Sequence, residues 1–173
     1  MVDALELLLV VNEFDEPLEP RPRHEVLKEG HWHRVAHVWI INDKHELLCQ
    51  KRSMRKDISP GMWEPFVAGH VCHEDNYFSG AVREVREETG IPVNKEGLRL
   101  VKIYKASTVK EFRAIFYLKW NGLIDDVVSE PDEIDEARWI PISTARKHIM
   151  DENDTQWFHP GYAKEMLSVL SLG

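Results

Sequence analysis

The pattern of apolar and polar positions predicts a chain of short strands with a few helices between them. Residues 35–41 give the strongest strand signal, because they are dense in β-branched and aromatic side chains. A polar turn at 42–45 makes 46–52 the hairpin partner of that strand. Further extended segments are expected at 5–11, 17–18, 66–68, 98–106, 112–120 and 137–140.

Helical spacing and capping residues predict the helices. The clearest helix begins after Asn76, a suitable N-cap, and stops at Gly90, where a glycine ends a helix well. Ser143 is expected to cap a second helix that runs to about residue 150. Short helices are also expected at 24–29 and 161–170. The last one should turn four residues towards the core, namely Tyr162, Met166, Val169 and Leu170.

Three glutamates in the helix after Asn76 are the first candidates for chemistry. Glu84, Glu87 and Glu88 are spaced i, i+3 and i+4, so their carboxylates share one helix face and repel one another. A divalent cation that prefers oxygen ligands, Mg²⁺ or Mn²⁺, would remove that repulsion. Arg83 and Arg86 stand among the acids and are expected to orient them.

Segment 69–91 resembles the Nudix box, the family pattern G-x5-E-x7-R-E-U-x-E-E-x-G-U in which U is a bulky aliphatic residue. The matching residues are Gly69, Arg83, Glu84, Val85, Glu87, Glu88, Gly90 and Ile91. Asp75 departs from the pattern, since the family has glutamate there, and we expect its contact to Arg83 to be weaker or water-mediated. Glu74 should point elsewhere. So many fixed positions favour this resemblance over a merely solvated, charged helix face.

The resemblance implies an α/β/α Nudix sandwich, with a mixed β-sheet between helices, that hydrolyses phosphoric anhydrides with Mg²⁺ or Mn²⁺. The implied metal ligands are Glu84, Glu87, Glu88 and the backbone carbonyl of Ala68, with Gly69 and Asp75 in supporting positions and Arg83 beside the catalytic glutamates. Glu84 is the first choice for general base. Some family members take the base from a later loop, which would nominate Glu130 or Glu133, although both also fit a role as solvated loop charges.

Cations near the predicted site suit a phosphate-rich substrate. Arg52 and Lys56 lie on the hairpin and loop before the box and are our candidates for diphosphate contacts. Lys51 has the same chemistry, but strand alternation places it on the face opposite Arg52. A simple surface role is the alternative for each of these residues.

The surrounding sequence is similar to the isopentenyl-diphosphate-isomerase-like branch of the Nudix family. The similar pieces are 11–17, 33–42, 50–53 and 60–63. His33 and His70 match two metal-binding histidines of the isomerases and could contact substrate, but Ala68 replaces the isomerase cysteine. Cys72 lies four residues further on and cannot take its place. We therefore expect a pyrophosphohydrolase that cleaves a nucleoside diphosphate linked to another moiety, or a nucleoside di- or triphosphate. The alternatives are an isopentenyl-diphosphate isomerase and a nucleotide sensor without turnover.

Length and composition favour one structural domain with a substantial core. The chain has 173 residues, 43% of them hydrophobic. We expect an N-terminal extension at 1–32, a Nudix domain at 33–152 and a C-terminal helix at 153–173.

The net charge of −8, concentrated at 125–136, argues against nucleic-acid partners, and no apolar run is long enough for a membrane span. Cys49 and Cys72 are expected to be unpaired thiols in a reducing cytoplasm, and a homodimer is compatible with the sequence.

Overall fold

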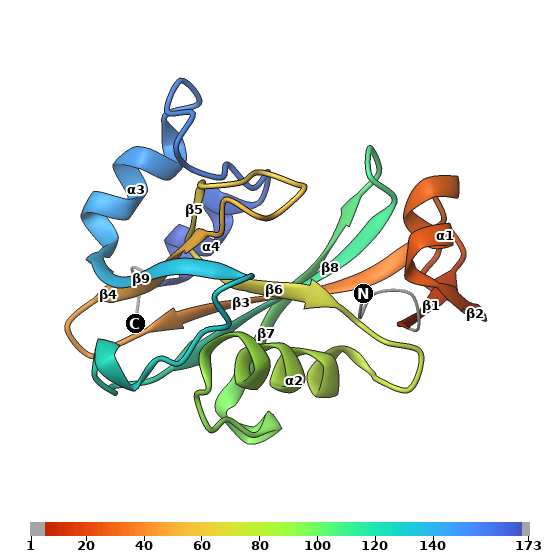
Figure 1. Cartoon of the computed structure of the whole chain (residues 1–173), viewed down its shortest axis with the longest axis horizontal. Helices are drawn as coiled ribbons and strands as arrows, with labels where there is room; N and C mark the ends of the chain where they lie inside the picture. The colour runs from red at the N-terminus through yellow and green to blue at the C-terminus, as the bar shows by residue number, and fades with distance from the viewer. Residues whose placement is uncertain (1–5, 171–173) are drawn as a thin grey trace.

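The structure, a computed structural model, describes residues 6–170 and has helices on both faces of one mixed sheet (Figure 1). Helix α2 (Tyr77–Thr89) covers one face, whereas α3 (Ile142–Met150) and α4 (Ala163–Leu170) lie on the other. This arrangement is the expected mixed α/β sandwich. In the described residues no helix is long and apolar enough to cross a membrane.

The strands mostly follow the hydrophobic segments of the sequence, with the proline-rich and largely exposed segment 17–22 as an exception. They are β1 (Leu7–Val11), β2 (Pro17–Pro22), β3 (His33–Ile41), β4 (Glu46–Arg52), β5 (Trp63–Glu64), β6 (Val67–His70), β7 (Leu98–Ala106), β8 (Glu111–Lys119) and β9 (Ile134–Pro141). A short helix, α1 (Arg23–Glu29), follows β2. The structure thus confirms the predicted strands at 46–52 and 98–106 residue for residue, and residue 5 of the first predicted strand lies outside the described part.

Strand β3 is the centre of the sheet. It pairs in parallel with β8 along its whole length and antiparallel with β6 over Val35 to Val38. Successive side chains of a strand point to opposite faces. Val38 and Ile40 therefore pack in the core beneath α2, whereas Trp39 packs in the core beneath α3 and α4. The same alternation decides for each side chain on β4, β5 and β6 whether it points towards α2 or towards α3 and α4.

Several predicted element starts are wrong by one to three residues, and those of β9 and α3 have a clear physical reason. Strand β9 begins at Ile134 instead of residue 137, because the end of the acidic segment continues the antiparallel pairing with β4, where Ile134 lies opposite Arg52. Helix α3 begins at Ile142, so Ser143 lies in its first turn and is not its cap. Pro141 precedes the helix with extended dihedral angles, and the Ile142 N–H donates to the His45 carbonyl.

Two side-chain predictions are also corrected. On α4 the residues that face the core are Ala163, Met166, Leu167 and Leu170, whereas Val169 is 37% exposed. Tyr162 is buried as predicted, but it lies just before the helix. Its hydroxyl lies 2.5 Å from His37 Nδ1 and accepts a hydrogen bond from Trp39 Nε1 at 3.4 Å. The C-terminal helix is thereby fixed to the central strand through a buried polar contact.

Replacing Tyr162 with phenylalanine is expected to destabilise the fold by about 1–3 kcal/mol, because two buried nitrogens on β3 lose their partner. For a chain of this length the melting temperature should fall by about 3–10 °C in a thermal unfolding experiment. Val169→Ala is the matched control on α4 and should change stability by no more than about 0.5 kcal/mol. An unchanged melting temperature for Tyr162→Phe would show that the hydroxyl contributes nothing to the docking of α4.

Candidate active site

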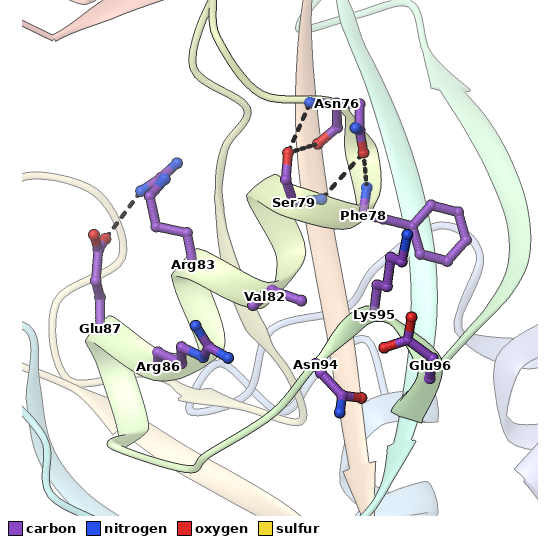
Figure 2. Close-up of a pocket in the computed structure, with 10 residues that line it drawn as sticks. All are labelled: Asn76, Phe78, Ser79, Val82, Arg83, Arg86, Glu87, Asn94, Lys95 and Glu96. Carbon is purple, nitrogen blue, oxygen red and sulfur yellow. Dashed lines mark hydrogen bonds and ion pairs between the residues drawn. The ribbon is translucent and has the colours of Figure 1, made fainter.

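Helix α2 starts and stops where its sequence dictates. The Asn76 side chain accepts hydrogen bonds from the Phe78 and Ser79 N–H groups, and the Ser79 hydroxyl returns a contact to the Asn76 N–H (Figure 2). Gly90 adopts a left-handed conformation, with φ of 68°, and its N–H donates to the Arg86 carbonyl. Ala81 and Val85 anchor the helix in the core. These contacts fix the rotation of α2 and so decide which glutamates face the sheet.

The position of Glu84 depends on a glycine in β6. Glu84 is buried, and a Cβ atom built on Gly69 would lie only 1.9 Å from Glu84 Cδ. Val67 and Gly69 share the sheet face towards α2, whereas Ala68 and His70 point to the opposite face. Only a residue without a side chain leaves room for the Glu84 carboxylate here. The glycine of the box is therefore explained by a close approach between strand and helix.

Arg83 holds the start of the box together. Its guanidinium contacts Glu84 at 2.8 Å, Glu87 at 2.9 Å and Asp75 at 3.1 Å, and it donates to the His70 carbonyl at 2.7 Å. The prediction of a water-mediated contact to Asp75 is wrong, since the shorter acid reaches Arg83 directly. The outward-facing Arg83–Glu87 pair is visible in Figure 2.

The structure contradicts the orienting role predicted for Arg86. Its guanidinium donates to the Val93 carbonyl at 2.5 Å and contacts none of the three glutamates. Arg86 lines a groove of about 530 Å³ on the outer side of α2 together with Phe78, Val82 and Asn94 (Figure 2). Glu74, by contrast, points into solvent beside His73 as expected.

A carboxylate cluster lies between α2 and the sheet, formed by Glu64, Glu84 and Glu88. Burial raises the pKa of Glu84 to about 7, although Arg83 opposes this shift. Burial and then the Glu84 carboxylate hold the pKa of Glu88 well above its usual range, with a smaller effect from Glu64. Gln50 Nε2 donates to Glu88 at 3.0 Å. Concentrated and poorly hydrated negative charge of this kind favours the binding of a cation.

Glu64 and Gln50 are residues that the sequence analysis missed. Gln50 lies opposite Glu64 in the β4–β5 register, so both side chains point to the face covered by α2. The alternation of side chains along β4 could have identified Gln50, because it places Gln50 and Arg52 on one face. Because β5 has only two residues, no pattern in the sequence could assign Glu64 to the same face.

Both cations predicted to contact phosphate are held by carboxylates. Arg52 Nη1 lies 3.1 Å from Glu64 Oε1, and Arg52 also donates to the Ile58 carbonyl. Lys56 Nζ lies 2.5 Å from Glu133 Oε2. Of the two loop candidates for general base, Glu133 thus lies beside the cluster, whereas Glu130 is exposed. The structure brings Arg52, Lys56 and the glutamates together on one side of the sheet.

The two histidines of the isomerase resemblance lie on the other side. His33 and His70 stack with their ring centroids 5.3 Å apart, and Arg23 Nε donates to His70 Nδ1 at 3.4 Å. His33 Nδ1 binds the His31 carbonyl. The buried Nε2 has no hydrogen-bond partner among residues 6–170 and lies 3.9 Å from a carboxylate oxygen of Glu111. His31 precedes β3, whereas His33 is the first residue of that strand. These histidines do not share a face with the carboxylate cluster.

The donor atoms of the box suit a hard divalent cation, although they are arranged for protein contacts. Carboxylate oxygens are the ligands that Mg²⁺ and Mn²⁺ prefer. Glu84 and Glu87 contact Arg83, and Glu88 accepts from Gln50. Within residues 6–170, no three His, Cys, Asp or Glu side chains converge in a ready metal-binding geometry. Glu87 is exposed and is held by the single contact with Arg83, so the set fits a cation once the Glu87 side chain leaves that partner.

Asp75→Ala is expected to lower turnover by about three- to tenfold, because Arg83 loses a carboxylate that fixes its position beside Glu84. The melting temperature should change little, since both side chains are partly exposed. Asp75→Glu restores the family residue and should retain or slightly increase turnover. Steady-state kinetics and thermal unfolding of both variants check this, and an Asp75→Ala variant with unchanged turnover would remove Asp75 from the supporting residues.

Comparison with known proteins agrees with the fold and the box. The NUDIX domain model matches residues 31–160. An uncharacterized Nudix hydrolase of Pseudomonas aeruginosa is 36% identical over 78% of this chain and 78% of its own length. Nudix hydrolase 3 of Arabidopsis thaliana is 27% identical over 77% of this chain, which spans only 19% of that protein. The crystal structure of DR0079 from Deinococcus radiodurans has a TM-score of 0.73 at 22% identity and covers 95% of this chain and 99% of its own.

The chain therefore belongs to the Nudix family. Its class is that of the Nudix hydrolases, enzymes that act on phosphoric anhydride bonds. Bacterial proteins named isopentenyl-diphosphate Delta-isomerases also match, over 82% or more of this chain, so the second resemblance is confirmed at the level of the family.

Proposed function

We propose that the chain is a pyrophosphohydrolase that depends on Mg²⁺ or Mn²⁺. Its substrate class is a nucleoside diphosphate linked to another moiety, or a nucleoside di- or triphosphate. The observation that carries this proposal is the carboxylate cluster beneath α2. There Glu84 occupies the space left by Gly69, and Glu88 accepts a hydrogen bond from Gln50, the residue opposite Glu64 in the sheet. An apolar or hydrogen-bonded core would fold more easily there, so a buried concentration of acids is best explained by chemistry.

In this proposal Glu84, Glu87 and Glu88, with the Ala68 carbonyl, hold the divalent cation. The chemistry that a bound cation supplies is neutralisation of phosphate charge and acidification of a water molecule. Arg83 positions Glu84 and Glu87, and Lys56 binds a phosphate oxygen of the substrate. Glu84 is our first choice to accept the proton of the attacking water, with Glu133 the alternative because of its place beside Glu88. The bond broken is a phosphoric anhydride, and water supplies the new oxygen.

A screen of nucleotide and isoprenoid diphosphates with Mg²⁺ or Mn²⁺, with products identified by mass, tests the proposal. Release of phosphate or of two phosphate-bearing products supports a hydrolase. Binding of nucleotides without any release would instead support the sensor interpretation. The screen also names the group attached to the diphosphate.

The isomerase is the second candidate, favoured by the pair His33 and His70 with Glu111 nearby. An isomerase must protonate one carbon and deprotonate another, and the methyl group of Ala68 offers no proton where the isomerases have their cysteine. We therefore expect no isomerisation of isopentenyl diphosphate. Incubation in D₂O followed by NMR checks this, and deuterium entering dimethylallyl diphosphate at a catalytic rate would overturn the hydrolase assignment.

A further inference from the structure

The two phosphate-binding candidates, Arg52 and Lys56, are neutralised in very different surroundings. Arg52 pairs with Glu64, whose side chain is only 7% exposed. Burial raises the pKa of Glu64 and Arg52 opposes this shift, so separating the pair would leave a charge without a partner away from water. Lys56 pairs with Glu133, whose side chain is 41% exposed. A carboxylate with that much access to water can leave its partner at little cost in solvation.

The Lys56–Glu133 pair also lies at the carboxylate cluster. Beside burial and Arg52, the Lys56 ammonium is one of the groups that act on the pKa of Glu64. Ile134, the neighbour of Glu133, lies opposite Arg52 in the β4–β9 register, which places Glu133 next to the Arg52–Glu64 pair. A phosphate that enters between these groups therefore meets a lysine already bound to an anionic oxygen.

The backbones of the two loops stay in place without this ion pair. The Ser53 N–H donates to the Glu133 carbonyl at 2.9 Å, and the Met54 N–H donates to an Asp135 carboxylate oxygen at 3.2 Å. A second pair, Arg55 with Asp132, links the same loops through side chains that are largely exposed. Loss of the Glu133 charge should therefore free the Lys56 side chain without separating the loops.

We propose that the Glu133 carboxylate competes with the substrate phosphate for Lys56. The phosphate binds by replacing Glu133 as the ionic partner of Lys56. The exchange is a change of ionic partner with no covalent step. Arg52 stays with Glu64 throughout, so the lysine is the cation that responds to the substrate. This inference rests on the proposed function, because it assumes that a diphosphate occupies the space beside the carboxylate cluster.

The test is the dissociation constant of methylenediphosphonate, a diphosphate that cannot be hydrolysed, measured by calorimetry in magnesium-containing buffer. Glu133→Gln removes the competing charge and should tighten binding about two- to fivefold relative to the wild type. Asp132→Asn is the matched control, since it breaks the neighbouring pair between the same loops and should leave the constant unchanged. In a Lys56→Gln background, Glu133→Gln should have no effect, because the cation for which it competes is gone.

The proposed exchange on Lys56 would be overturned if Glu133→Gln bound methylenediphosphonate no more tightly than the wild type. It would also be overturned if Asp132→Asn tightened binding equally. Turnover of nucleotide diphosphates by the wild type, measured separately, reports on the proposed function. If the wild type turns over nucleotide diphosphates but Glu133→Gln does not bind methylenediphosphonate more tightly, the hydrolase proposal stands and the exchange on Lys56 is wrong. If Glu133→Gln alone binds methylenediphosphonate more tightly but the wild type turns over no compound in the screen, the exchange on Lys56 stands and the hydrolase proposal is wrong.

Discussion

Glu88→Gln is expected to reduce turnover a hundredfold or more while leaving the melting temperature measured without divalent cations unchanged or raised. Loss of a charged group that stabilises a transition state typically costs about 2.7–4 kcal/mol in activation free energy. The folded state, by contrast, is relieved of an anion whose pKa is raised by burial and by Glu84. Turnover should therefore fall in this variant without a loss of stability.

Glu87→Gln tests the exposed member of the same helix face. Within residues 6–170 its side chain contacts Arg83 and is otherwise exposed, so the change perturbs no packing. A metal ligand at this position nevertheless predicts a loss of turnover of similar size. Glu96→Gln, also exposed and on the outer side of α2, is the control and should be fully active. Near-normal turnover in both Glu87→Gln and Glu88→Gln, with folding intact, would exclude these residues as metal ligands.

Gly69→Ala is expected to reduce turnover about a hundredfold and to destabilise the fold by about 1–3 kcal/mol, the usual range for overpacking. The new methyl group would occupy the position of the Glu84 carboxylate, with contacts of 1.9 Å to Cδ and 2.0 Å to Oε2. The carboxylate must then move away from Arg83, its partner at 2.8 Å. The change displaces a catalytic candidate without altering its chemistry.

Gly97→Ala is the matched control for this variant. A Cβ atom at Gly97 would meet Leu118 Cδ1 at 3.4 Å, an ordinary contact distance. Kinetics and thermal unfolding of the two alanine variants therefore separate the removal of a glycine from the displacement of Glu84. If Gly69→Ala and Gly97→Ala behave alike, the close approach of β6 to α2 has no part in activity.

The sequence by itself determined the box helix and much of the sheet. Asn76 caps α2 and Gly90 ends it because both signals act on backbone groups within a few residues. The strands at 46–52 and 98–106 follow from local hydrophobic patterns in the same way. Eight residues in one segment predicted the Nudix family, and the match of the NUDIX domain model to residues 31–160 confirms it. Such features need no knowledge of what lies across the fold.

Only the tertiary structure decided which charges meet. Arg86 belongs to the same helix as Arg83 but binds the Val93 carbonyl, because the rotation of α2 is set by its buried residues. Glu64 reaches Arg52 through the β4–β5 register, and Glu133 reaches Lys56 across 77 residues of chain. Asp75 contacts Arg83 directly because the backbone brings them together, despite the shorter side chain. Contacts of this kind depend on strand register and helix rotation, which are set by packing between distant segments and leave no local pattern in the sequence.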